Sequence, residues 1–251
     1  FGAVIKSYYA EKNGIDKNSI YSVAIMPCTS KKYEVQREEH STCGSQDIDC
    51  SLTTRELARM IKQAGIDFAS LPDEEFDRPF GEATGAAVIF GTTGGVMEAA
   101  IRTVYEILEK KPLENLNIEA VRGLDGIKEA TLTIAGKDVR VAVVHGTKNA
   151  RIILDKIKAG EHYDFVEIMA CPGGCINGGG QPIVDSYTKS VTDVKALRAK
   201  ALYTEDESSN IRKSHENPAI IELYEQYFGN PCGHKSHELL HTHYTDRSSQ
   251  K

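Results

Sequence analysis

Three cysteines and a pair of glycines are the residues of this chain whose types and spacing best suit metal chemistry. Cys171 and Cys175 lie four positions apart in the stretch MACPGGCINGGGQP, and Cys28 lies far upstream. Thiolates are soft ligands that suit iron–sulfur clusters, zinc and copper(I). Gly173 and Gly174 let the backbone approach a bulky inorganic group and direct amide N–H groups at its sulfurs. The combination favours an iron–sulfur site.

Both cysteine positions follow short apolar segments that are typical of β-strands. Residues 21–26 (YSVAIM) lead to Cys28 and residues 164–169 (DFVEIM) lead to Cys171, so each segment ends in Ile-Met-x-Cys. Ligands bind beyond the carboxyl ends of strands in open parallel sheets. The repeat therefore predicts one cluster held between two similar halves. The alternatives are that each cysteine is an apolar filler, the commoner role of a single buried cysteine, or that the Cys-x3-Cys pair forms a disulfide.

Length, charge and composition exclude several classes of protein. With 251 residues, 40% of them hydrophobic, the chain is long enough to bury a core in one large domain or two lobes. A net charge of −6 without a Lys/Arg run argues against nucleic-acid binding. No stretch reaches the ~20 apolar residues of a membrane span, and the chain opens without a signal-peptide pattern. Six cysteines do not make a disulfide framework here, which favours a reducing cytoplasm, with the periplasm still open.

Helical and strand patterns alternate along the chain. Thr53 and Glu56 form a capping box that begins a helix through Ala64. A glycine turn after residues 86–90 resembles a phosphate loop, but it lacks the P-loop and dinucleotide motifs. The alternation predicts an α/β fold of two lobes with largely parallel sheets flanked by helices, and a helical C-terminal segment. Further helices are predicted at residues 1–13, 96–110, 149–158, 195–203 and 210–228, strands at 21–26, 86–90 and 164–169, and a hairpin at 129–144.

Six longer motifs, in this order along the chain, resemble those of the [FeFe]-hydrogenases. MPCTSKKYE and MACPGGCINGGGQP resemble the second and third cluster-binding signatures of that family. The resemblance covers nearly the whole chain, but the first signature of the family, a Thr-Ser-Cys run, does not occur in it. In the family that signature lies upstream of the point at which this chain begins. The motifs are MPCTSKKYE at 26–34, LTTREL at 52–57, FGTTGGVMEAA at 90–100, VRGLDGIKEA at 121–130, MACPGGCINGGGQP at 169–182 and HELLHTHY at 237–244.

The resemblance implies an H-cluster, in which a [4Fe–4S] cubane shares one thiolate with a diiron unit that bears CO, cyanide and an azadithiolate bridge. Cys28, Cys171 and Cys175 match three cubane ligands of the family, and Cys175 matches the shared thiolate. The implied enzyme is an iron-only hydrogenase that reversibly reduces protons to molecular hydrogen with electrons from a ferredoxin-type donor. The alternative is a hydrogen sensor or a hydrogenase-like iron–sulfur protein without fast turnover.

Four further residues acquire roles from the same resemblance. Lys31 matches a lysine that bonds a cyanide of the diiron unit, whereas adjacent lysines such as Lys31 and Lys32 are usually a solvated turn. Met26 and Met169 match apolar walls against the diiron ligands, and Phe90 matches a residue that lines the diiron pocket. In other settings these would be ordinary core residues.

The resemblance also predicts the domains and partners. Residues 1–193 match the cluster-binding catalytic domain, incomplete at its N-terminal side, and residues 194–251 match a helical small-subunit-like segment that wraps it. An upstream portion or a companion chain is expected to supply the fourth cubane cysteine and the proton path. The other cysteines match no family ligand; Cys43 and Cys50 fall in a polar loop predicted at 35–51, and Cys232 precedes a histidine-rich tail.

Overall fold

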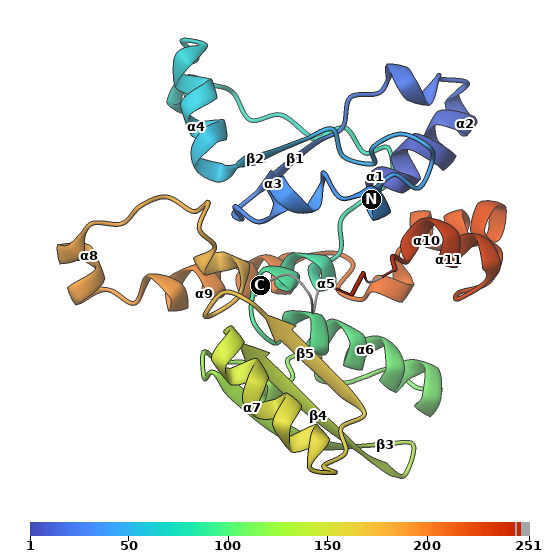
Figure 1. The fold of residues 1–251 in the computed structure, drawn as a ribbon, viewed down its shortest axis with the longest axis vertical. Helices are drawn as coiled ribbons and strands as arrows, with labels where there is room; N and C mark the ends of the chain where they lie inside the picture. The colour runs from blue at the N-terminus through green and yellow to red at the C-terminus, as the bar shows by residue number, and fades with distance from the viewer. Residues whose placement is uncertain (244, 247–251) are drawn as a thin grey trace. The chain divides into compact units, whose positions relative to one another are not determined.

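The computed structural model describes residues 1–243, 245 and 246 and divides into two compact units (Figure 1). The first unit contains Phe1–Phe80 and the chain from Ala219 onward, and the second contains Gly81–Pro218. The predicted segment 194–251 therefore contributes residues to both units. Tyr244, the last residue of the HELLHTHY motif, and residues 247–251 lie outside the described residues.

The N-terminal helix of the first unit confirms the helix predicted at residues 1–13. It runs through α1 (Gly2–Val4), a π turn (Ile5–Tyr9) and α2 (Ala10–Asn13), and it ends at Gly14 with φ of +63°. Apolar side chains of this helix pack against the C-terminal helices of the same unit, which fixes their common core. The C-terminal elements are α10 (Pro218–Leu223), a π turn (Tyr224–Phe228) and α11 (His234–Leu240), and the core consists of Val4, Tyr8, Leu223 and Phe228.

A two-stranded parallel sheet forms the other part of the first unit. Strand β1 (Val23–Met26) pairs with β2 (Cys50–Thr53) in parallel, and α4 (Thr54–Gln63) follows with the predicted capping box. The short helix α3 (Lys31–Glu34) comes after β1. The prediction that Cys50 lies in an exposed polar loop is wrong, because Cys50 pairs with Val23 as the first residue of β2.

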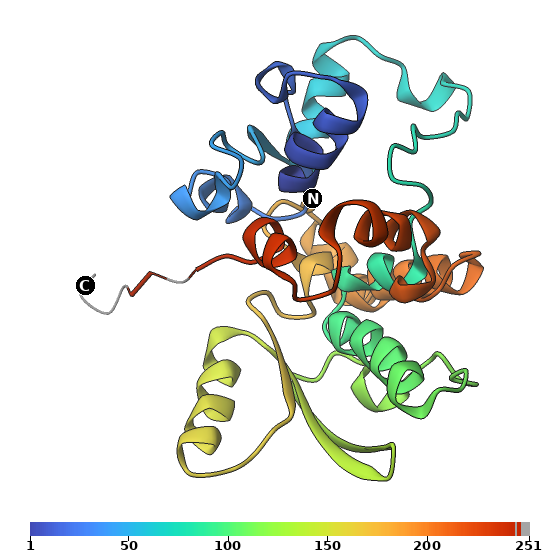
Figure 2. The same cartoon turned by 90° about the vertical axis from the view of Figure 1, so that its right-hand side faces the viewer.

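The second unit is built on a three-stranded sheet between two helices. Strands β3 (Ile127–Ile134) and β4 (Lys137–His145) form the predicted hairpin, and β5 (Phe165–Met169) joins β4 in parallel. Helices α6 (Gly95–Glu109) and α7 (Thr147–Lys158) lie on opposite sides of this sheet (Figure 2). Alternate residues of β4 face the two helices, as a strand buried on both faces requires. Val141 and Val143 pack with the α6 residues Met97 and Ile101, and Ala142 and Val144 pack with Ile153 of α7.

The strand predicted at residues 86–90 is wrong. These residues form α5 (Gly85–Val88) and a 3₁₀ turn (Ile89–Gly91), and Oγ1 of Thr84 caps the helix by accepting a hydrogen bond from Ala87 N–H at 3.2 Å. Within this segment Ala86 and Ile89 are buried, and a short apolar run does not distinguish a strand from a helix.

Helices from the last third of the chain complete the α/β fold, whose class is confirmed. The elements here are α8 (Ser186–Val191) and α9 (Val194–Ser208), which includes the predicted helix 195–203. The helix predicted at 210–228 is wrong in its first part, because α10 begins only at Pro218, a residue that suits the first position of a helix. Among the described residues, no helix is long and apolar enough to cross a membrane.

Candidate metal centre

The two cysteines of the third signature lie on a tight turn directly after β5. Gly174 N–H donates to the carbonyl of Cys171 at 2.9 Å, and a 3₁₀ turn begins at Cys175. Gly173 and Gly174 have φ of +89° and +93°, a conformation that glycine adopts without steric cost. Both glycines are buried, while both cysteines are partly exposed. The turn therefore presents two thiols four residues apart from a backbone conformation that favours glycine.

The loop before α6 packs directly against this turn. Thr93 N–H donates to the carbonyl of Gly173 at 3.1 Å. A Cβ on Gly174 would lie 2.7 Å from Thr93 N and 2.9 Å from the carbonyl oxygen of Gly91. These are backbone atoms, so the contact leaves no room for a side chain. The glycine turn at 91–95 thus supports the cysteine turn.

Glu167 joins β5 to the N-terminus of α6, a role that the sequence reasoning missed. Its carboxylate is buried and accepts hydrogen bonds from Gly94 N–H at 2.6 Å and Met97 N–H at 2.7 Å. Burial raises the pKa of Glu167, against the opposing effect of these amides. A carboxylate at a helix N-terminus also interacts favourably with the helix dipole. The feature of the sequence that could have indicated this role is the acidic residue within the apolar segment DFVEIM.

His145 is a second residue that the sequence reasoning missed. It ends β4, pairs with Met169 at the end of β5, and is 7% exposed. Its Nδ1 atom has no hydrogen-bond partner among residues 1–243, 245 and 246. The feature of the sequence that could have drawn attention to His145 is its position at the end of the apolar run VAVVH.

Met169 and Phe90 lie in the same unit as the cysteine pair. Met169 is partly buried, two residues before Cys171. Phe90 belongs to the 3₁₀ turn before the glycine loop and is 45% exposed. The second unit therefore contains Cys171, Cys175, Gly173, Gly174, Met169 and Phe90 of the predicted site residues.

The remaining predicted residues lie in the first unit. Met26 ends β1, and Cys28 follows it, partly buried. Lys31 begins α3, and its Nζ lies 2.6 Å from Glu34 Oε1. Met26 and Lys31 line one cavity of about 410 Å³ within this unit.

Lys32 differs from Lys31 in its contacts. Its Nζ lies 2.8 Å from Glu56 Oε2 and donates to the carbonyl of Ser51 at 2.9 Å. It therefore connects the α3 segment to β2 and to the cap of α4. The interpretation of both lysines as a merely solvated turn does not fit Lys32.

No disulfide joins any of the six cysteines, all of which lie within the described part of the chain. Cys43 donates a weak bond from its Sγ to the carbonyl of Ala3 at 3.7 Å, and Cys232 is exposed. The disulfide interpretation of the Cys-x3-Cys pair therefore finds no support in the structure.

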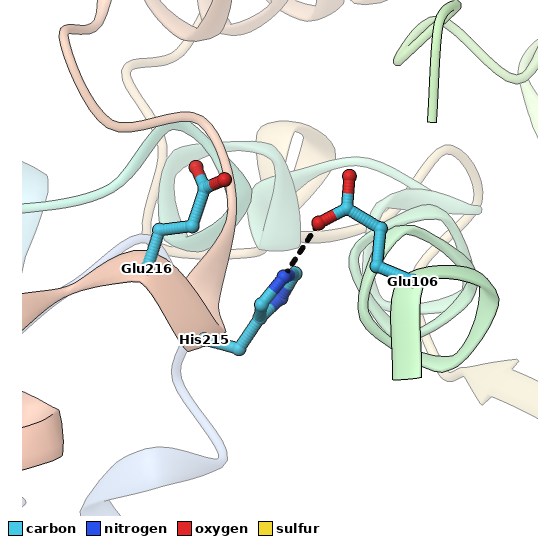
Figure 3. Close-up of side chains that lie close together, drawn as sticks. All are labelled: Glu106, His215 and Glu216. Carbon is cyan, nitrogen blue, oxygen red and sulfur yellow. Dashed lines mark hydrogen bonds and ion pairs between the residues drawn. The ribbon is translucent and has the colours of Figure 1, made fainter. Parts of the chain in front are cut away.

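Glu106, His215 and Glu216 form a second group of side chains whose ligand atoms lie within 4.8 Å of one another (Figure 3). Glu106 already accepts hydrogen bonds from His215 Nε2 at 2.8 Å and Leu113 N–H at 2.8 Å, and it pairs with Lys213 Nζ at 2.7 Å. Burial raises the pKa of Glu106, but these partners outweigh it and lower the pKa to about 2. Since the Lys213 ammonium supplies the positive charge, we interpret this group as a structural link between α6 and residues 213–216.

Comparison with known families matches nearly the whole chain. The family model described as "Iron only hydrogenase large subunit, C-terminal domain" matches residues 1–179. The model described as "Iron hydrogenase small subunit" matches residues 192–247.

Curated relatives agree with this match. The NADP-reducing hydrogenase subunit HndD of Solidesulfovibrio fructosivorans is 50% identical over 98% of this chain and 42% of its own length. Iron hydrogenase 1 of Clostridium pasteurianum is 46% identical over 97% of this chain and 43% of its own length. The chain thus spans less than half the length of these relatives. Protein NAR1 of Arabidopsis thaliana is 31% identical over 97% of this chain and 54% of its own length.

A solved structure shows the same fold. A variant of the [FeFe]-hydrogenase HydA1 of Chlamydomonas reinhardtii superposes with a TM-score of 0.81 at 43% identity. The match covers 97% of this chain and 68% of that one. The predicted resemblance is confirmed by the family match, the relatives and the fold together. The chain belongs to the iron-only hydrogenase family, and its residues 1–179 match the C-terminal domain of the large subunit.

Proposed function

We propose that this chain is the catalytic portion of an [FeFe]-hydrogenase that interconverts protons and molecular hydrogen with a ferredoxin-type carrier. The observation that carries the proposal is the turn after β5, where Cys171 and Cys175 follow a parallel strand. Its buried glycines, Gly173 and Gly174, have positive φ angles. This is the position at which open parallel sheets bind ligands.

The residues fit an iron–sulfur cofactor. Cys171 and Cys175 are soft donors on a glycine turn, and Cys28 is a third partly buried thiol that follows a parallel strand. We propose that these three cysteines hold the cubane and that Cys175 is the thiolate shared with the diiron unit. When bound, the H-cluster supplies the iron centre at which protons are reduced and hydrogen is oxidised.

The other site residues have supporting roles in this proposal. Met26 and Met169 provide soft apolar surface at the two strand ends. Phe90, which is partly exposed beside the glycine loop, would line the diiron pocket. Lys31 releases Glu34 and donates from its Nζ to an anionic cyanide, an interaction that favours a cation with three donors.

We propose that the fourth cubane thiolate comes from outside these 251 residues, as a further stretch of polypeptide or a companion chain. A cubane with cysteine ligands requires four thiolates. Cys50 is the first residue of β2, Cys43 donates a weak bond to the Ala3 carbonyl, and Cys232 is exposed. Replacing Cys43, Cys50 and Cys232 together with serine is expected to leave the iron content unchanged. Loss of the cubane in that triple variant would assign the ligand to one of these three.

A cytoplasmic location of the protein is also part of the proposal.

The decisive experiment is infrared spectroscopy of the matured full-length protein and of Cys175→Ala. The wild type is expected to show CO and cyanide bands, and the variant to lose them, because the bridging thiolate has no substitute in this turn. Cys232→Ala, which removes an exposed thiol, is the matched control and is expected to keep the bands. Bands of wild-type intensity in Cys175→Ala would contradict the ligand assignment.

The second candidate is a hydrogenase-like iron–sulfur protein without fast turnover. It is favoured by relatives whose names describe iron–sulfur assembly, such as the cytosolic Fe-S cluster assembly factor narfl of Xenopus tropicalis, 29% identical over 97% of this chain and 51% of its own length. A protein that binds [4Fe–4S] clusters but shows no CO bands and no hydrogen evolution with a reduced viologen dye would support this second function.

A further inference from the structure

The α6 face of the second unit carries a buried histidine beside the cysteine turn that no role above explains. Val141 and Val143 of β4 pack with α6 residues, and side chains alternate along a strand. His145, two residues after Val143, therefore belongs to the same face. Its partner in the parallel register is Met169, and Gly146 N–H donates to the Met169 carbonyl at 2.8 Å. His145 thus lies at the strand ends from which the cysteine turn begins.

Charged neighbours surround this position on the same face. Lys128 of β3 and Glu167 of β5 both pair with Val143, so they share the α6 face with His145. Lys195 Cδ lies 3.6 Å from the position that a Cβ on Gly173 would take. Lys128 and Lys195 are therefore both close enough to His145 to interact with its charge, and Lys195 also lies beside the turn that carries Cys171 and Cys175.

The surroundings of His145 favour the neutral form of its ring. Burial lowers its pKa, and Lys128 and Lys195 lower it further, against the weaker opposite effect of Asp125. A neutral imidazole has one N–H donor. Nδ1 is buried without a partner among the described residues, and leaving a buried polar atom unpaired has an energetic cost. A partner that the polypeptide does not provide would remove this cost.

We propose that His145 Nδ1–H donates a hydrogen bond to a sulfur of the cluster held by Cys171 and Cys175, and so raises the reduction potential of that cluster. This inference rests on the proposed function, because it requires the cluster. An N–H donor stabilises the reduced cluster more than the oxidised one, since the reduced cluster carries more negative charge. Hydrogen bonds to the sulfurs are among the factors that set the potentials of iron–sulfur clusters.

The test uses the full-length protein reconstituted with iron and sulfide only, so that the cubane is studied without the diiron unit. Three variants separate the donor from the side-chain volume. His145→Asn places an amide N–H near the Nδ1 position, His145→Gln moves that donor away, and His145→Leu removes it. The control is His162→Leu, a 79% exposed histidine before β5, at the opposite end of the same sheet.

The midpoint potential is measured by redox titration with electron paramagnetic resonance detection. At a fixed potential, His145→Leu and His145→Gln are expected to lower the reduced-to-oxidised ratio about tenfold, which corresponds to about 59 mV for one electron. His145→Asn and His162→Leu are expected to match the wild type.

Every other outcome contradicts either this inference alone or the proposed function together with it. Equal potentials in His145→Asn and His145→Gln overturn the inference, and this pair decides it even if His145→Leu fails to hold a cluster. A wild-type protein that binds no iron and sulfide overturns the proposed function and this inference with it. A wild type with a cluster whose potential no variant changes overturns only the inference.

Discussion

At Gly174 and Gly173, the absence of a Cβ atom allows the cysteine turn to form. Both have positive φ, so any other residue is strained there by about 1–3 kcal/mol. They differ in the space around them. A Cβ on Gly173 would meet only side-chain atoms at 3.5 Å or more, whereas one on Gly174 would lie 2.7 Å from Thr93 N.

We therefore expect Gly174→Ala to reduce the iron bound per chain strongly, because the turn must move away from the loop before α6. Gly173→Ala is the matched control and is expected to keep most of the iron. Iron and sulfide analysis after reconstitution, with thermal unfolding of the metal-free variants, provides the measurement. Equal iron contents would show that the close approach of the two loops is not required.

Lys31 and Lys32 are adjacent but have different partners. Replacing each one with alanine therefore tests cofactor binding and folding separately. Lys31→Ala is expected to lower the diiron content, because a buried anionic ligand left without its cation typically costs about 3–5 kcal/mol. Lys32→Ala is expected to keep the diiron unit but to lower the unfolding temperature of the metal-free protein, since it loses Glu56 and Ser51. Infrared band intensity and calorimetry check the two effects. The reverse pattern would contradict the assigned role of Lys31.

At the scale of an element, the start of α4 depends on one carboxylate. Glu56 accepts hydrogen bonds from the backbone and side chain of Thr53 and pairs with Lys32. The hydrogen bond from Lys32, followed by those from Thr53, lowers the pKa of Glu56 from 4.5 to about 2. A carboxylate whose pKa is lower in the folded state stabilises the fold when it is ionised.

This stabilisation is complete above about pH 4.5 and is lost as the pH falls toward 2. We expect Glu56→Gln to be less stable than the wild type at pH 7, with the difference shrinking over that interval. Urea unfolding of both proteins at pH 7, 4 and 2.5 measures it. A difference that stays constant with pH would mean that the ionised carboxylate is not what stabilises the cap.

At the scale of the whole molecule, a buried ion network connects distant parts of the second unit. Arg102 of α6 pairs with Glu98 at 2.6 Å and with Asp206 of α9 at 2.8 Å, and all three side chains are 0% exposed. Arg212 also pairs with Asp206, at 2.6 Å. The residues that match the small-subunit family are therefore joined to α6 by charges without access to water.

Asp206→Asn is expected to destabilise the protein by about 3–5 kcal/mol, because it removes one of the two buried carboxylates that pair with Arg102 and the carboxylate that pairs with Arg212. The exposed pair of Lys12 and Glu222 provides the control, and Glu222→Gln is expected to change stability little. Denaturant unfolding of the metal-free proteins makes the comparison. Equal stabilities would show that α9 is held by apolar packing instead.

Features with local signals could be predicted from the amino-acid sequence alone. The capping box at Thr53, the hairpin turn at residues 135–136 and the strand that ends at Met169 each depend on a few neighbouring residues, and each was predicted. The long motifs around Cys28 and Cys171 likewise identified the family.

Features that depend on distant partners required the folded chain. Residues 86–90 are helical because Thr84 caps them and the surrounding unit buries Ala86 and Ile89, while their apolar pattern fits a strand equally well. Cys50 lies in a strand because β1, more than twenty residues away, pairs with it. Glu167 and His145 acquire their significance from α6 and from the register with β4, which no local pattern encodes. Pairing and burial are properties of segments brought together by folding, so short-range patterns do not contain them.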